Sequence, residues 1–320
     1  MCTAISYVGC AGHYFGRNLD LDYCYSEEVT VLPRCFPLHF RCGYTLRQHY
    51  AMIGMATISE DYPLFYEATN EQGLSMAGLN FPGNAVYNPK ACSMDNIAPF
   101  ELIPWVLSRC ASVKEATHLM HRLNVWRLPF SRRFPLTPLH WLLSDDKESI
   151  VIEQMADGLH LYANPFGILT NNPPFPCQLN RLADFMQLQP TPPENKFCLH
   201  LQAYSNGMGA IGLPGDYSSA SRFVRAAFVK ENSVAEQDDV AQFFHMLSSV
   251  AMPRGSVITE SGRTEITQYS CCCDSIKGIY YYTTYENSRI TAVNMRNCQL
   301  DNDKLLTYPL RRSTDIHFEN

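Results

Sequence analysis

The sequence lacks any long apolar run. No stretch of its 320 residues approaches the ~18–20 consecutive apolar residues that a membrane helix needs. The first residues also lack a charged segment followed by an apolar one, which is the pattern of a secretory signal peptide. These two absences predict a chain without a membrane segment and a cytoplasmic location.

Basic clusters are missing too. The chain has 25 Lys and Arg against 31 Asp and Glu, a formal net charge of −6, and no run of basic residues. A protein that binds nucleic acid neutralises phosphates with Lys and Arg, and so needs the opposite balance. The composition therefore argues against a nucleic-acid partner.

No Cys-x-x-Cys pair occurs among the 13 cysteines. In a chain without a secretion signal, we expect most of them to be reduced, buried, small hydrophobic residues. The one cluster is Cys271-Cys272-Cys273. In a strand, successive side chains point to opposite faces, so these three thiols cannot converge on one metal ion. His118 and His121 lie three apart without a third ligand nearby. The sequence thus predicts no metal site, and a zinc protein built on the cysteine cluster is a distant alternative.

The pattern of apolar residues predicts an α+β fold. Strands are expected at 3–7, 13–23, 28–32, 51–58, 74–80, 140–143, 149–155, 159–162, 167–170, 269–273, 278–285 and 290–295. Helices are expected at 98–110, 112–123, 180–187, 219–230 and 238–250. Groups of strands alternate with groups of helices, which is typical of two antiparallel sheets with helices packed outside them.

The domain organisation is simple. The sequence contains no internal repeat and no low-complexity segment. Its one linker-like stretch is 189–202, which is polar and rich in proline and predicts a loop or a projecting arm. We therefore expect a single domain over residues 1–320.

The N-terminus offers a nucleophile and a base on one residue. Cys2 follows Met1, and an initiator methionine before a residue as small as Cys can be trimmed. An α-amine has a pKa of ~7.7–8.0 and is partly unprotonated near neutral pH. A free thiol titrates at about 8.5, so a modest positive environment gives the thiolate. The alternative interpretation is that Cys2 is simply the second residue of a strand.

Gly207, Gly209 and Gly212 match the dinucleotide pattern G-x-G-x-x-G, but they lack its context. The motif should open a helix, and Pro214 follows directly. No acidic residue stands where the ribose contact would be. We interpret the stretch as a loop near a ligand or as a tight crossing of two segments.

Arg17 and Asp20 flank the apolar Leu19 in a strand that is otherwise hydrophobic. Buried charges are costly unless they are paired, so either the strand is at the surface or both charges face a site. A spacing of three residues places them on opposite faces of a regular strand. A shared site would need a bend or a bulge.

Three further stretches carry polar side chains of interest. Asn80 and Asn171 each stand at the end of a predicted strand, close to a proline. Turn chemistry favours Asn there, but its amide is also a neutral donor suited to an oxyanion hole. Arg222 and Arg225 lie on one predicted helix, where one side chain could face solvent and the other could turn inward.

Seven motifs together resemble one family. They are Met1-Cys2-Thr3, FGRNLD at 15–20, AGLNFPG at 77–83, SIVIEQMADG at 149–158, LTNNP at 169–173, GLPGD at 212–216 and SRFVR at 221–225. The set resembles the choloylglycine hydrolase family, which holds bile salt hydrolases and penicillin V acylases. The motifs run in the order of that family and span essentially the whole chain.

The resemblance implies a fold and a nucleophile. The fold would be the Ntn-hydrolase fold, a four-layer αββα sandwich of two antiparallel sheets between helix layers. Cys2 would be the nucleophile, with its own α-amine as the base. Asp20 would hold that amine, and Arg17 would lie beside the thiol and favour the thiolate.

It also implies the groups that would stabilise the intermediate. The Asn171 side chain would donate to the oxyanion, and the Asn80 backbone N–H would be the second donor. Arg222 would order the site. Asn172 and Arg225 are adjacent candidates of lower rank.

The implied reaction is hydrolysis of the amide bond of glycine- or taurine-conjugated bile salts through a thioester on Cys2, without a metal or organic cofactor. Asn80 favours bile salts, because penicillin V acylases of this family tend to carry Tyr there. One alternative is a penicillin V acylase or a related N-acyl amide hydrolase. Another is a catalytically silent ligand-binding relative, which retention of Met1 would favour.

The resemblance extends to the substrate pocket and the assembly. Candidates for the lining of the pocket are apolar residues near strand ends, namely Tyr23, Tyr25, Phe65 and Leu136. The arm at 189–202 resembles the segment that clasps neighbouring subunits in family tetramers, which implies a homotetramer. Conjugated bile salts as the small-molecule substrate would suit a gut bacterium.

Overall fold

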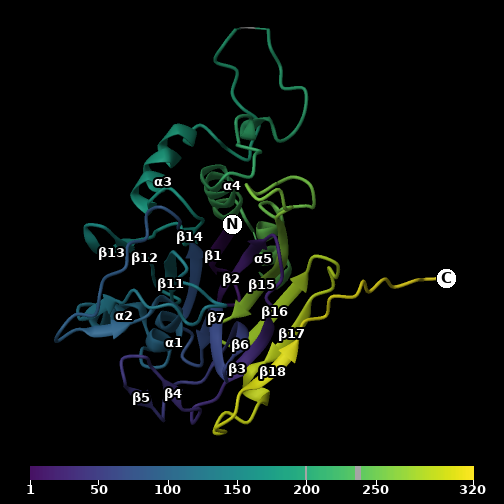
Figure 1. The fold of residues 1–320 in the computed structure, drawn as a ribbon. Helices are drawn as coiled ribbons and strands as arrows, with labels where there is room; N and C mark the ends of the chain where they lie inside the picture. Colours follow the sequence, from purple (N-terminus) through teal and green to yellow (C-terminus); the bar gives the residue numbers. More distant parts are fainter. Residues whose placement is uncertain (199, 235–238) are drawn as a thin grey trace.

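Two large antiparallel sheets dominate the computed structural model, which describes residues 1–198, 200–234 and 239–320 (Figure 1). The first sheet has the order β14 (Ile168–Leu169), β1 (Cys2–Val8), β2 (His13–Leu21), β15 (Ile266–Asp274), β16 (Ile279–Thr284) and β17 (Thr291–Asn294). The second has the order β13 (Gly158–Ala163), β12 (Ser149–Met155), β11 (Leu139–Ser144), β8 (Ser75–Asn80), β7 (Tyr62–Asn70), β6 (Met52–Ser59), β3 (Glu28–Leu32) and β18 (Leu306–Pro309).

Helices cover the outer face of each sheet. On the first sheet, α4 (Ser219–Glu231) contacts β1 and β14, α5 (Asp239–Ser248) contacts β2 and β15, and α3 (Phe175–Leu182) packs against α4. On the second sheet, α1 (Leu102–Leu107) contacts β7 and β8, and α2 (Val113–Met120) joins the same apolar core. The layers therefore run helix, sheet, sheet, helix, which confirms the predicted α+β sandwich.

The central strands are covered on both faces, which explains their composition. In β1 and β2 every residue from Cys2 to Tyr7 and from His13 to Asp20 is buried. The three neighbours Cys271, Cys272 and Cys273 are buried for the same reason, although they alternate between faces. No disulfide joins cysteines of the described residues.

Smaller elements complete the chain. They are β4 (Leu38–His39), β5 (Thr45–Leu46), β9 (Asp95–Ile97), β10 (Leu123–Val125) and 3₁₀ turns at Pro99–Glu101, Ala183–Phe185, Met208–Ala210 and Met295–Asn297. Of the helices in the described residues, none has the length and apolar character that crossing a bilayer requires. Within those same residues, no group of three or more His, Cys, Asp or Glu side chains could hold a metal ion.

Several element boundaries differ from the sequence prediction. The helix expected at 180–187 is α3, and it begins at Phe175 because Pro176 stands in its first turn, where a missing N–H costs nothing. The helix expected at 98–110 is a 3₁₀ turn followed by the short α1. The helix expected to reach 123 ends at Met120, and the next residues pair as β10 with β9. Strand β7, which carries Pro63 and a central Glu67, was not predicted.

The stretch 189–202 forms an arm that projects away from the sheets (Figure 1), and residue 199 within it lies outside the described residues. At the base of the arm, a Cβ on Gly209 would lie 2.0 Å from the Thr191 carbonyl oxygen. The glycine-rich stretch is therefore a tight crossing of two segments. The helix expected at 238–250 is α5, and residue 238 also lies outside the described residues.

Candidate active site

Cys2 begins β1 and opens onto a cavity between the two sheets. It pairs with Leu19 of β2, so its thiol shares a face with Leu19 and with Arg17 two residues earlier. All three line a cavity of about 300 Å³. The remaining lining is mostly apolar. It comes from the end of β2 and the loop after it, from β6 to β8, from β11, from α1 and the turn before it, and from the loop at 128–137. The thiol thus lies at the wall of a mainly apolar pocket beside one cation.

Three of the four predicted pocket residues line this cavity, namely Tyr25, Phe65 and Leu136. Tyr23 lies outside the lining. Its side chain is 40% exposed, its hydroxyl contacts that of Tyr25, and the Arg263 guanidinium lies 5.3 Å from its ring. The two tyrosines are only two residues apart, but they lie beyond the end of β2, where strand alternation no longer fixes a common face.

Arg17 is fully buried between the sheets. Its Nη1 donates to the main-chain oxygens of Tyr66, at 3.1 Å, and Gly78, at 2.7 Å. Its Nη2 has no hydrogen-bond partner among the described residues. Burial alone lowers the pKa of the Arg17 guanidinium, but acidic neighbours, Cys2 first, raise it above its ordinary value. Arg17 is therefore a permanent cation with a donor to spare beside the thiol.

Asp20 lies on the opposite face of β2, toward the helices. Its Oδ1 accepts a hydrogen bond of 2.6 Å from the Thr267 hydroxyl. Its Oδ2 has no hydrogen-bond partner in the described part of the chain and lies 4.0 Å from Nη1 of Arg222. A register shift in β15 between Thr267 and Tyr269 lies opposite this position. The bulge is thus in the neighbouring strand, and β2 itself does not bend to bring Arg17 and Asp20 together.

Arg222, on α4, joins the outer face to the start of β1. It is fully buried, and its Nη1 lies 2.5 Å from both the Cys2 carbonyl oxygen and the Thr3 hydroxyl. Its Nη2 donates to Oδ1 of Asn171 at 2.8 Å. Burial lowers the pKa of Arg222, while the charges of Asp20 and Cys2 oppose that shift. This guanidinium fixes the main chain at Cys2.

Asn171 follows β14 and contacts Cys2 directly. Its Oδ1 accepts from the Cys2 main-chain nitrogen at 2.9 Å, and its Nδ2 donates to the Asn80 main-chain oxygen at 2.7 Å. The structure carries Met1, so the Cys2 nitrogen is an amide here, and it would become an α-amine if Met1 were trimmed. Oδ1 of Asn171 accepts two hydrogen bonds, and Nδ2 donates to a carbonyl oxygen. These contacts fix the orientation of the Asn171 side-chain amide.

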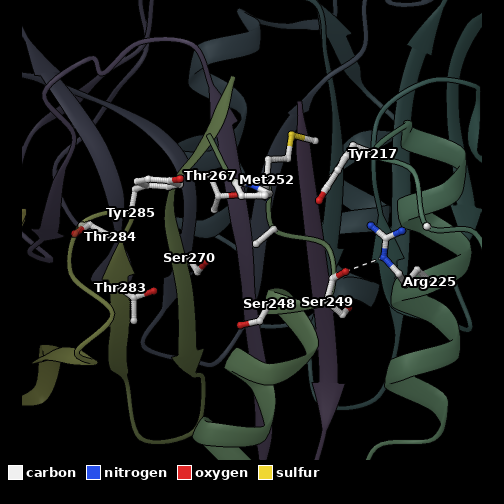
Figure 2. Close-up of a pocket in the computed structure, with 13 residues that line it drawn as sticks. Tyr217, Arg225, Ser248, Ser249, Met252, Thr267, Ser270, Thr283, Thr284 and Tyr285 are labelled. Carbon is white, nitrogen blue, oxygen red and sulfur yellow. Dashed lines mark hydrogen bonds between the residues drawn. The ribbon is translucent and has the colours of Figure 1, made fainter. Parts of the chain in front are cut away.

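Asn172 and Arg225 point elsewhere. The Asn172 amide donates to the Pro82 oxygen at 2.7 Å and accepts from Asn84 at 3.0 Å. Figure 2 shows Arg225 bound to the Ser249 carbonyl, at 2.7 Å, at the wall of a second cavity of about 640 Å³. That cavity is lined largely by hydroxyl side chains, including that of Thr267. Both residues connect loops and contact no atom of Cys2 in the hydrogen bonds of the described residues.

Sequence reasoning missed two acidic side chains near the site. Glu67 is buried in β7, and its Oε2 lies 3.7 Å from Nε of Arg17. Glu265 contacts the Met1 amine. The available signal for Glu67 was a charged residue inside the apolar run before Asn70. Because no strand was predicted there, the sequence could not indicate that this side chain points inward. Glu265 precedes β15 and gave no signal.

The arrangement suits acyl transfer. A thiol lies beside a buried guanidinium, the nitrogen of the same residue lies beside an amide oxygen, and a carboxylate oxygen is left without a donor. These groups lie on three separate elements that meet at the first residue of β1. The pocket beside the thiol can bind an apolar acyl group.

Comparison with known proteins shows which family has a similar sequence. A family model described as linear amide C–N hydrolases, choloylglycine hydrolase family, matches residues 2–308. The chain is 48% identical over 325 residues to a bile salt hydrolase/transferase of Lactiplantibacillus plantarum. It is 37% identical over 333 residues to one of Clostridium perfringens. Both alignments cover 100% of this chain and of the relative.

Solved structures agree with these relatives. A mutant of the conjugated bile acid hydrolase from Clostridium perfringens has a TM-score of 0.94 at 37% identity and covers 100% of both chains. The penicillin V acylase from Agrobacterium tumefaciens has a TM-score of 0.77 at 19% identity, over 97% of this chain and 92% of that one. The second likeness concerns the fold alone, and together they confirm the expected Ntn-hydrolase fold.

Proposed function

This chain belongs to the choloylglycine hydrolase family of linear amide C–N hydrolases, and from that membership we propose that it hydrolyses the amide bond of glycine- or taurine-conjugated bile salts. The observation that carries the proposal is the thiol of Cys2 beside Arg17 at the wall of an apolar cavity. The names of the relatives, bile salt hydrolase/transferase and conjugated bile acid hydrolase, support this substrate class.

The reaction begins at sulfur. The Cys2 thiolate, beside the buried charge of Arg17, attacks the amide carbonyl carbon and gives a tetrahedral oxyanion. The α-amine of Cys2 passes a proton to the leaving nitrogen, the C–N bond breaks, and the amino acid leaves. Water then attacks the thioester, gives its proton to the same amine and releases the bile acid and the thiolate.

Two donors are assigned to the oxyanion. Nδ2 of Asn171 carries two hydrogens, and one of them donates to the Asn80 oxygen. The second hydrogen, together with the Asn80 backbone N–H, would stabilise the oxyanion, and one such donor is typically worth about 2.7–4 kcal/mol. Asn80 also lines the cavity, which supports its assignment as the second donor.

The remaining residues order the amine. Oδ1 of Asn171 holds the Cys2 nitrogen, and the undonated Oδ2 of Asp20 is the acceptor assigned to the free ammonium. Asp20 now pairs its main-chain N–H and C=O with Met1, at 2.9 and 2.6 Å. Trimming Met1 removes these two bonds and creates the base, so the mechanism requires it.

The test is product analysis by mass spectrometry. Purified protein, with the loss of Met1 checked by intact mass, is incubated with glycocholate, taurocholate and penicillin V, and Cys2→Ser serves as the control. We expect free bile acid from the wild type only. Release of phenoxyacetate alone would make the protein a penicillin V acylase. Three intact substrates after confirmed trimming would leave a ligand-binding relative and contradict the proposal.

We also propose a homotetramer assembled through the arm at 189–202. Its support is the exposed apolar surface of the arm, where Phe197 is 90% and Leu201 is 57% exposed. A single domain over 1–320, a cytoplasmic location and a gut-bacterial source remain predictions from the sequence.

A further inference from the structure

A buried carboxylate lies behind Arg17, and the reaction as described does not use it. Glu67 projects from the second sheet, and the hydroxyls of two tyrosines of the first sheet donate to it. Tyr280 donates to Oε1 at 2.6 Å, and Tyr269 donates to Oε2 at 2.8 Å. The same Oε2 lies 3.7 Å from Nε of Arg17. All four side chains are buried, so their mutual placement is fixed by packing.

A β-bulge creates this arrangement. In the pairing of β6 with β7, Met55 is opposite Glu67 and Ala56 is opposite Phe65, so Tyr66 is the extra residue. A bulged residue leaves the ladder and redirects its neighbours. Here it directs the Tyr66 carbonyl to Nη1 of Arg17 and places the next residue, Glu67, at the Nε edge.

Arg17 is therefore held on every side but one. Nη1 is occupied by two carbonyl oxygens, while Nε donates to the Asn18 carbonyl oxygen at 3.5 Å and forms an ion pair with Oε2 of Glu67 at 3.7 Å. The nitrogen left over is Nη2, which has no partner among the described residues, and Arg17 lines the cavity together with Cys2. An unrestrained arginine side chain has many rotamers, and this one has a single free donor in a fixed place.

We propose that Glu67 is a positioning residue, whose carboxylate, fixed by Tyr269 and Tyr280, holds the Arg17 guanidinium in the orientation that presents Nη2 to the sulfur of Cys2. It also sets the charge at the site, because its negative charge offsets part of that of Arg17. The inference rests on the proposed thiolate mechanism, but it concerns the environment of the sulfur and not the identity of the substrate.

The surroundings of Glu67 fit this role. Burial raises the pKa of the Glu67 carboxyl above its ordinary value, and Arg17, the two tyrosine hydroxyls and the Cys271 thiol each limit that rise. A buried carboxylate without partners would be costly, and this one has four. The same volume could be filled by an apolar side chain, so a charged group in this place points to an electrostatic task.

The decisive variant is Glu67→Gln, which keeps the shape and removes the charge. Its readout is the rate at which iodoacetamide alkylates Cys2 as a function of pH, followed on the N-terminal peptide by mass spectrometry. Removing a negative charge favours the thiolate, so we expect the midpoint of the alkylation curve to move down by about one pH unit. Turnover of glycocholate should fall about tenfold to a hundredfold in kcat, with a small change in KM, because Nη2 loses its fixed place.

Glu67→Asp keeps the charge, and we expect it to retain the wild-type midpoint and to recover most of kcat. An unchanged midpoint and kcat in Glu67→Gln would overturn the proposal. Alkylation needs no turnover, so this arm of the test stands even if no bile salt is hydrolysed. The two proposals therefore fail separately.

If Glu67→Gln does not fold, two milder variants decide the question. Tyr280→Phe removes one hydroxyl from Glu67, and Tyr282→Phe removes a buried hydroxyl two residues along the same strand, where it accepts from the Arg311 N–H at 3.2 Å. We expect Tyr280→Phe to lower kcat severalfold at equal thermal stability, and Tyr282→Phe to leave it unchanged. Equal kcat values and equal alkylation curves in the two variants would contradict the proposal.

Discussion

At the scale of single residues, Cys2 belongs to two environments at once. Its side chain shares the inner face of the first sheet with Leu19 and Arg17, and its main chain is bound from the outer side by Arg222. Asp20 lies on that outer face. Cys2, at the start of β1, presents its thiol to the inner face, while its main-chain nitrogen and carbonyl contact other partners. Arg17 and Asp20 can therefore both lie near Cys2 from opposite faces, and β2 needs no bend.

Neighbouring asparagines allow a sharp test at this scale. Asn171→Ala removes the amide assigned to the oxyanion, and we expect kcat to fall about 10²–10³-fold, the usual effect of losing one such donor. Asn172→Ala removes an amide bound to Pro82 and Asn84, so its kcat should stay within a few fold of the wild type. Both are measured by steady-state hydrolysis of glycocholate. Equal losses in the two variants would count against the assigned role.

The sequence alone could rank single residues only in part. Cys2, Arg17, Asp20, Asn80, Asn171 and Arg222 were identified through motifs, and the structure brings them together. The helical pattern alone did not distinguish Arg222 from Arg225, and only the resemblance ranked Arg222 first. In the structure Arg222 is fully buried and Arg225 is half-buried. Glu67 had no motif to identify it, and its partners are distant in sequence.

At the scale of elements, buried polar side chains join the two sheets at the end away from Cys2. His13 of β2 contacts the hydroxyls of Ser6, at 2.9 Å, and Ser275, at 2.8 Å, within the first sheet layer. Ser144 of the second sheet reaches the same ring nitrogen as Ser6, at 3.3 Å. The ring is fully buried, and burial lowers the pKa of His13 to about 4. Burial therefore favours the neutral imidazole in the folded chain.

The stability of the sandwich should therefore depend on pH. The unfolded chain binds the His13 proton near pH 6.5 and the folded one near pH 4, so the contribution is complete above 6.5 and is lost as pH falls toward 4. The loss should reach about 3 kcal/mol in the free energy of unfolding. Urea unfolding at a series of pH values measures it.

His13→Gln should flatten this part of the curve relative to the wild type. His39→Gln, at an exposed position, should keep the full slope. Parallel curves for His13→Gln and the wild type would show that another group carries the dependence.

At the scale of the whole molecule, the arm at 189–202 is the part that the sandwich does not explain. It leaves the body between α3 and α4 (Figure 1). Its large apolar side chains, Phe197 and Leu201, are exposed. Apolar side chains held in water are unfavourable in a monomer, and their burial by a neighbouring copy would offset that cost. The proposed homotetramer follows from this exposure together with the family resemblance.

Paired substitutions test the assembly. The double variant Phe197→Ser with Leu201→Ser should shift the molar mass from light scattering below four chains. The control, Ile316→Ser with Phe318→Ser, changes an equally exposed pair near the C-terminus and should leave the mass unchanged. A wild-type mass of one chain, or no difference between the two variants, would refute assembly through the arm.

The sequence by itself determined the local features of this protein. The apolar pattern predicted most strands, and the periodicity with its capping serine predicted α4 to within a residue, because these depend on neighbours along the chain. The glycine-rich stretch at 207–212 was left open between a loop near a ligand and a tight crossing, and the structure shows the crossing. The ordered motifs determined the family, and they predict Cys2 as the nucleophile. Composition determined that no long apolar segment exists.

Only the tertiary structure decided how these parts meet. Two register shifts, one in β15 opposite Asp20 and one at Tyr66 in β7, set the directions of Thr267 and Glu67. The tertiary structure also leaves Tyr23 outside the cavity lining and brings His13 into contact with Ser144 of the second sheet. The physical reason is that bulges and buried contacts depend on which strands pair and which sheet faces which, and no local pattern records that.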